Sequence, residues 1–96
     1  MTRYRLTPAA RRDLSAIWDY TEEHWSTQQA EVYVREIQVG IERVAEDPRR
    51  GRDCSELREG YRNYAVGSHL VFYLTRPDGV DVIRILHQRM DPSRHL

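Results

Sequence analysis

The chain is 96 residues long and carries 15 basic and 15 acidic side chains, so its formal net charge is zero. This length suits a single domain, residues 1–96, with one modest hydrophobic core. Zero net charge argues against a protein held on nucleic acid by its overall field, and we expect no direct sequence-specific DNA binding, although a local basic patch stays open. Every basic residue is arginine, which excludes catalysis by a lysine amine.

The cysteine content and the hydropathy of the sequence indicate its cellular compartment and the ligands it can bind. Cys54 is the only cysteine in the sequence, which excludes an internal disulfide, and it has no zinc-ligand spacing with the four histidines. No stretch approaches the length needed to span a membrane, and the N-terminus lacks the apolar core of a signal peptide. We therefore expect a cytoplasmic protein without a metal, a cofactor or a membrane partner.

The start of the chain predicts one short strand and a first helix. Residues 4–6 have the pattern of a strand. Thr7 can cap free backbone amides and Pro8 suits the first helical position, so a helix is predicted to begin there. Apolar residues then recur at helical spacing up to a break at residues 24–26.

A second helix is predicted after this break. Ser26 and Gln29 have the spacing of a capping box. The following apolar residues recur at helical spacing as far as Asp47, which precedes a proline and therefore avoids helical geometry. Because the link between the two helices is short, they are predicted to pack as an antiparallel hairpin.

Residues 49–60 are polar and rich in arginine, and they are predicted to form a surface connection, or alternatively a flexible basic loop that contacts a partner. Strands are predicted over residues 62–66, 69–75 and 80–87, joined by tight turns that force antiparallel neighbours. The element order β-α-α-β-β-β predicts an α+β fold, with the helical hairpin packed on a small antiparallel sheet. After residues 91–92 we expect only a short polar tail.

The end of the last predicted strand is the most informative segment, because an apolar strand runs there into a polar cluster. His87 can titrate near neutral pH, and Arg84 and Arg89 could hold an anion. The chemistry alone favours a structural role, in which His87 bonds to the backbone and Arg89 pairs with Asp91 or another acid. Anion binding is the alternative.

Two further features concern the predicted surfaces. If the last three strands are neighbours, Arg62, His69 and Arg84 could share one face of the sheet, although a one-residue slip in register would reverse that placement. Three large aromatic residues are predicted to lie in the core, with a partly open apolar groove for a partner helix as the alternative: Trp18, Trp25 and Tyr33.

Several short segments follow one family's pattern: residues 4–10, 13–14, 17–18, 30–31, 47–49 with 51, 60–62, 67–69, 71–73 and 82–91. They are spread along nearly the whole chain and occur in the expected order. The sequence therefore resembles the ParE toxins of the RelE/ParE superfamily of type II toxin–antitoxin systems, and the last segment resembles the family's closing signature closely.

This resemblance implies a toxin that inhibits DNA gyrase by binding it rather than by acting as an enzyme, and that is neutralised by a ParD-type antitoxin encoded beside it. The antitoxin is expected to lay an extended or helical C-terminal tail along the toxin, giving a hetero-oligomer. Toxicity in the family is most tied to the C-terminal segment, which implies target binding by His87, Gln88, Arg89, Met90 and Asp91. The residues expected to contact the antitoxin are Trp18, Trp25, Tyr33, Arg62 and Tyr64.

Two alternatives stay open. The first is a ribosome-dependent messenger-RNA endonuclease of the RelE type, which needs a base, an acid and cations around the scissile phosphate. The chain departs from that pattern, since Arg62 and Tyr64 stand in place of its lysines and His95 in place of its late tyrosine. The residues that could still supply the chemistry are Arg62, His69, His87 and Arg89. The second alternative is a non-toxic, antitoxin-bound regulator.

Overall fold

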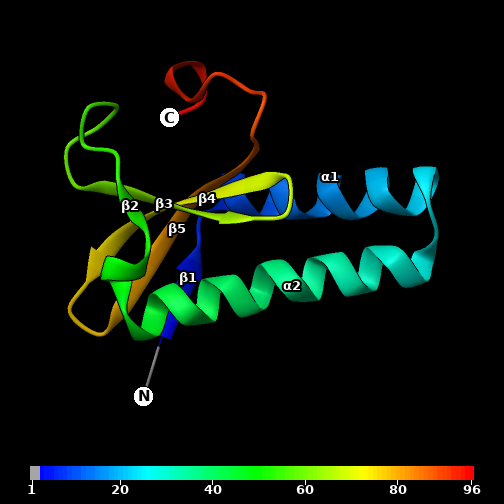
Figure 1. Ribbon diagram of the computed structural model, residues 1–96, viewed down its shortest axis with the longest axis horizontal. Helices are drawn as coiled ribbons and strands as arrows, with labels where there is room; N and C mark the ends of the chain where they lie inside the picture. The colour runs from blue at the N-terminus through cyan, green and yellow to red at the C-terminus, as the bar shows by residue number, and fades with distance from the viewer. Residues whose placement is uncertain (1–2) are drawn as a thin grey trace.

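In the computed structural model, which describes residues 3–96, two long helices cover one face of a five-stranded sheet (Figure 1). The strands lie in the spatial order β1-β5-β4-β3-β2. Their bounds are Arg3–Leu6 for β1, Arg52–Asp53 for β2, Tyr61–Val66 for β3, His69–Arg76 for β4 and Gly79–His87 for β5. The α+β class, the order of the predicted elements and the three consecutive antiparallel strands are confirmed.

The sheet differs from the prediction in two respects. It is mixed rather than antiparallel, because β1 runs parallel to β5 beside it. It also holds a fifth strand, because the predicted surface connection contains β2, which pairs with the start of β3. A short 3₁₀ turn, Pro48–Arg50, leads from the second helix into β2. No local pattern announces either pairing, because both depend on partners distant in the sequence.

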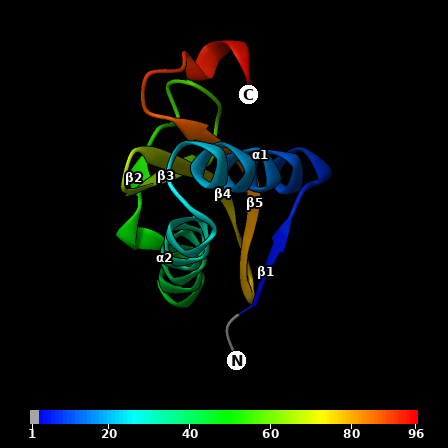
Figure 2. The same cartoon turned by 90° about the vertical axis from the view of Figure 1, so that its right-hand side faces the viewer.

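The two helices, α1 (Pro8–His24) and α2 (Thr27–Glu46), form the predicted antiparallel hairpin. Figure 2, which looks along their axes, shows them running side by side. The Thr7 hydroxyl accepts a hydrogen bond from the Ala10 amide at 3.1 Å, and the Ser26 hydroxyl accepts one from the Gln29 amide at 3.0 Å. Both predicted helix starts are therefore confirmed, since each cap satisfies an amide that the helix leaves unpaired.

The main core lies between this hairpin and the sheet. Helix residues Ile37, Ile41 and Val44 pack there with strand residues such as Val82. Tyr73 is fully buried in the same layer, and its hydroxyl donates a 2.7 Å hydrogen bond to the Pro48 carbonyl. This bond satisfies the one polar atom of a side chain that otherwise packs as a hydrophobe.

The opposite face of the sheet carries a smaller apolar cluster of Cys54, Phe72 and Leu86. Two segments cover it, the loop after β2 and the end of the chain, where Leu96 packs against the cluster. Both segments lie on the same side of the molecule in Figures 1 and 2. The prediction of a merely polar tail is therefore wrong, because the tail forms a 3₁₀ turn, Pro92–Arg94, and returns an apolar side chain to the sheet.

Over residues 3–96, no helix is both long enough and apolar enough to cross a membrane.

Candidate functional site

The joined end of the helix pair extends past the sheet (Figure 1), and a groove of about 810 Å³ lies between it and the end of β5. We call it the C-terminal groove, and its main lining side chains are Tyr20, Trp25, Tyr33, His69, His87, Arg89 and Met90. Three of these are large, apolar and exposed, with exposed fractions of 61% for Tyr20, 76% for Trp25 and 47% for Met90. Exposed apolar side chains that gather in one groove are typical of an interaction surface.

A cluster of three hydrogen-bonding side chains forms the floor of this groove. His69 and His87 face each other across β4 and β5, with ring centroids 5.2 Å apart in an edge-to-face arrangement. The Tyr33 hydroxyl lies 2.6 Å from His69 Nδ1 and accepts a hydrogen bond from the Ser68 amide at 3.1 Å. Burial, reinforced by the nearby His87, lowers the pKa of His69, so its ring is neutral near pH 7.

The segment after β5 is held to the rest of the fold by its backbone. The Gln88 amide donates to the Ser68 carbonyl at 2.9 Å, and the Met90 amide donates to the His87 carbonyl at 2.9 Å. The Arg89 amide donates to His87 Nδ1 at 3.1 Å. His87 therefore has the predicted backbone partner, and its ring helps to fix the turn that carries Arg89 and Met90 into solvent.

Of the charged side chains at the end of this segment, Asp91 is bonded to its neighbours and Arg89 is exposed. Asp91 accepts hydrogen bonds from the Ser93 amide and hydroxyl, at 3.0 and 2.7 Å, and these bonds lower the pKa of its carboxyl. Its ionic partner is Arg94, at 3.8 Å. Within the described residues Arg89 takes part in no ion pair, so the predicted pairing of Arg89 with Asp91 is wrong.

The structure brings together only part of the predicted arginine and histidine set. Arg62 pairs with Tyr73 and His69 lies four residues along the same strand, so both face the helices but are separated by about 13 Å. Arg62 Nη1 instead donates to the Gly51 carbonyl at 2.8 Å. Arg84 pairs with Phe72 and lies on the other face, because it is an odd number of residues from His87. The prediction that Arg84 shares their face is wrong.

Arg84 instead connects three parts of the fold. Its guanidinium grips both carboxylate oxygens of Asp13 on α1, at 2.7 and 2.8 Å, and also donates to the His95 carbonyl at 3.0 Å. The Asp13 carboxylate accepts a further bond from the Ile85 amide at 2.9 Å, where β5 extends beyond its pairing with β1. No local sequence pattern predicts this contact, because Asp13 and Arg84 are far apart along the chain.

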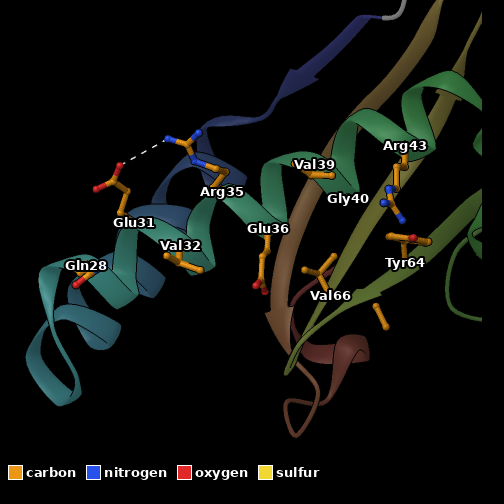
Figure 3. Close-up of a pocket in the computed structure, with 11 residues that line it drawn as sticks. Gln28, Glu31, Val32, Arg35, Glu36, Val39, Gly40, Arg43, Tyr64 and Val66 are labelled. Atoms are coloured by element: carbon orange, nitrogen blue, oxygen red, sulfur yellow. Dashed lines mark ion pairs between the residues drawn. The ribbon is translucent and has the colours of Figure 1, made fainter.

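A second groove, of about 660 Å³, lies between α2 and the outer edge of β3 (Figure 3). We call it the α2 groove, and its lining includes Val32, Val39, Gly40, Tyr64 and Val66. A Cβ on Gly40 would lie 2.6 Å from Val66 Cγ2, so the glycine allows the helix to approach the strand closely. Charged residues on its rim include the Glu31–Arg35 pair, 3.6 Å apart.

The α2 groove is bordered by a part of β3 whose outer edge is not paired with another strand of the described chain. Strand β2 pairs with β3 only at Arg62 and Asn63. Residues 64–66 of β3 therefore have no strand on their outer side within residues 3–96. An extended segment could pair with such an edge through backbone hydrogen bonds. Sequence reasoning missed this groove; Val32 and Val39, which fall outside the predicted apolar stripe, were the available signal.

The five predicted antitoxin contacts do not form one surface. Trp18 lines a shallow groove between the helices, Trp25 and Tyr33 line the C-terminal groove, Tyr64 lines the α2 groove, and Arg62 binds Gly51. Tyr33 packs partly against the core as predicted, whereas the core placement of Trp25 is wrong. Trp25 lies at the link between the helices, where no strand lies beneath it.

These features describe a small α+β binding platform: a helical hairpin on a sheet, two grooves, and an anchored C-terminal segment with an exposed arginine and methionine. The chain belongs to the ParE toxins. It matches the model of the family described as ParE toxin of type II toxin-antitoxin system, parDE, over residues 4–92. The fold is accordingly RelE/ParE-like.

Similar proteins agree with this assignment. The chain is 51% identical to Toxin ParE1 of Mycobacterium tuberculosis (strain ATCC 25618 / H37Rv), over 99% of this chain and 98% of that protein. It is 47% identical to Toxin ParE1 of Caulobacter vibrioides, over 100% and 99%, and 38% identical to Toxin ParE of Escherichia coli, over 95% and 89%. A solved structure of the chromosomal ParDE TA system from P. aeruginosa has the same fold, with a TM-score of 0.77 at 18% identity, covering 91% of this chain and 96% of that one.

Proposed function

We propose that this ParE toxin inhibits DNA gyrase by binding it, that the segment from His87 to Asp91 provides the contact, and that a ParD-type antitoxin neutralises it. The observation that carries the proposal is the anchored segment after β5. Backbone hydrogen bonds fix its start, and Arg89 and Met90 project from it without an intramolecular ionic partner for the arginine among the described residues. Because its backbone is already held, this segment loses little backbone conformational freedom on binding.

Binding suits this geometry better than RNA cleavage does. A nuclease would need its base, acid and cations around one phosphate. His69, His87 and Arg89 share the C-terminal groove, but Arg62 lies about 13 Å away along the sheet and is bound to Gly51. The ring of His87 is also engaged by the Arg89 amide. The endonuclease is therefore the second candidate.

The proposed antitoxin site is the α2 groove. Its floor exposes Val32 and Val39, with exposed fractions of 46% and 41%, and the outer edge of β3 at residues 64–66 offers backbone groups beside them. An antitoxin tail that is helical over the groove or extended along this edge would bury both valines. Of the predicted contacts, Tyr64 lies in this groove. Both proposed partners imply that the toxin is cytoplasmic, and neutralisation by the antitoxin implies a hetero-oligomer of the two.

The test is a gyrase supercoiling assay with the purified chain and with Arg89→Ala and Met90→Ala variants. Inhibition by the wild-type chain, weakened roughly tenfold by either substitution, would support the proposal. Site-specific cuts in ribosome-bound message, abolished by His87→Ala, would instead establish the endonuclease. If cells expressing the chain alone grow normally, the remaining alternative is a non-toxic regulator that binds the antitoxin.

A further inference from the structure

We infer that the C-terminal groove receives an acidic segment of gyrase that also carries a large apolar side chain, and that Trp25 at the end of the helical hairpin contacts this segment together with Arg89. This inference rests on the proposed function and adds a second element, the helix link, to the target surface. It also assigns a chemistry to the part of the target that is recognised.

The exposed apolar side chains of the molecule point to two separate surfaces. Within residues 3–96, the exposed large hydrophobic residues are Tyr20, Trp25, Val32, Val39 and Met90. Two of them, Val32 and Val39, line the α2 groove, and the other three line the C-terminal groove. The C-terminal groove is therefore the larger apolar surface, and it is continuous with the proposed target-binding segment.

The charges in the C-terminal groove select an acidic occupant. Its ionisable lining groups, apart from the tyrosines, are Asp13, His69, His87 and Arg89. Both oxygens of Asp13 are held by Arg84, at 2.7 and 2.8 Å, so that carboxylate is already neutralised. Arg89 has no ionic partner among the described residues and is a permanent cation at the rim. A carboxylate on the partner would complete this pair.

The geometry places an apolar side chain of the partner beside that carboxylate. Trp25 is 76% exposed and Met90 is 47% exposed, and both border the same groove as Arg89. An indole and a thioether form an adaptable surface for an aromatic or aliphatic side chain. Tyr20 is stacked on His24, with ring centroids 3.9 Å apart, which holds it at the edge of this surface.

Single-stranded nucleic acid is the competing occupant, because a base could stack on Trp25 and a phosphate could pair with Arg89. The charges argue against it. Such binding tracks the backbone with several cations, whereas this groove holds one permanent cation within a chain of zero net charge. His69 does not add a second, because burial lowers its pKa.

The test uses Trp25→Ala and Arg89→Glu in the full chain, with Arg58→Glu as a matched charge reversal on an exposed residue of the loop after β2. Inhibition of supercoiling, direct binding to gyrase and binding to the neighbouring gene's antitoxin are measured for each. We expect Trp25→Ala and Arg89→Glu to weaken gyrase binding about tenfold or more, and Arg58→Glu to change it less than about twofold. The effect of Arg89→Glu should shrink at high salt.

Four results would overturn the inference in different ways. If the wild-type chain inhibits gyrase and both groove variants inhibit it equally well, the groove assignment fails while the proposed function stands. If the variants lose antitoxin instead, the groove belongs to the antitoxin. If the wild-type chain binds a single-stranded oligonucleotide and Arg89→Glu abolishes that binding, the occupant is nucleic acid. A wild-type chain that neither binds nor inhibits gyrase removes the proposed function and this inference together.

Discussion

At the residue scale, the contact between Asp13 and Arg84 joins the first helix, the last strand and the end of the chain. The two side chains are only 14% and 23% exposed, and four hydrogen bonds meet there. A well-aligned, largely buried ion pair adds little net stability as a pair. Removing one partner is destabilising, because it leaves the other charge uncompensated. The chain offers a comparison in Arg76 and Asp81, which are 2.7 Å apart and of which the arginine side chain is 49% exposed.

We expect Asp13→Ala to lower the free energy of unfolding by about 2–3 kcal/mol, because it strands the Arg84 guanidinium and the Ile85 amide. Arg76→Ala, which removes the more exposed partner of its pair with Asp81, should cost less than about 1 kcal/mol. Urea denaturation at neutral pH measures both. Equal losses for the two variants would show that the Asp13 contact is no more than a surface ion pair.

His69 contributes to the pH dependence of the folding stability, and the sign of this contribution follows from its surroundings. Burial lowers the pKa of the folded histidine below the unfolded value of about 6.5. Its share of the stability is therefore present above that unfolded value and is lost as the pH falls through the folded pKa. The facing groups are Tyr33, His87 and, more distantly, Asp13.

Comparing the wild-type chain with His69→Asn isolates this contribution, because the asparagine oxygen can still accept a hydrogen bond but does not titrate. We expect the wild-type chain to lose more unfolding free energy than the variant between about pH 7.5 and pH 5. Denaturant titrations across that range measure the difference. If the two curves stay parallel, His69 titrates alike in the folded and unfolded states.

At the element scale, the sequence predicted what depends on local spacing and missed what depends on distant partners. The two helices are predicted correctly from their caps at Thr7 and Ser26. The last three strands are predicted correctly from the strand pattern after residue 61. The pairing of β1 with β5 and the addition of β2 carry no local signal. The candidate site follows the same division: the exposed segment after β5 was predicted, whereas the α2 groove depends on how closely Gly40 lets a helix approach β3.

The α2 groove gives a prediction for the antitoxin. Val32→Glu combined with Val39→Glu should weaken antitoxin binding about a hundredfold, because the proposed complex would bury two glutamate carboxylates without partners in place of two apolar side chains. Both side chains are over 40% exposed in the free toxin, at 46% and 41%, so its stability should change by less than about 1 kcal/mol. Calorimetric titration with the antitoxin measures the first effect and thermal unfolding the second.

If this variant still binds the antitoxin at wild-type strength, the α2 groove is not the antitoxin site. Gyrase inhibition by the same variant separates the two grooves. If gyrase inhibition falls together with antitoxin binding while the fold is intact, the α2 groove binds both gyrase and the antitoxin.

At the scale of the whole molecule, the sheet is covered on both faces by unequal layers. The helices seal one face, whereas only the loop after β2 and the last residues cover the cluster of Cys54, Phe72 and Leu86 on the other. The same last residues are tied to Arg84 through the His95 carbonyl. The thin cover and the end of β5 are therefore joined into one structural unit.

Cys54 reports on this unit, because it is the only thiol in the sequence and is 2% exposed. Burial raises the pKa of its thiol, which further slows its reaction as a thiolate. Leu96→Ser removes an apolar side chain from the cover and should cost about 1 kcal/mol or more of unfolding free energy. We expect it to speed labelling of Cys54 by a thiol reagent severalfold, whereas Met90→Ser, at an exposed position of the same segment, should leave the rate unchanged. If Leu96→Ser labels at the wild-type rate, the loop after β2 protects the cluster without the chain end.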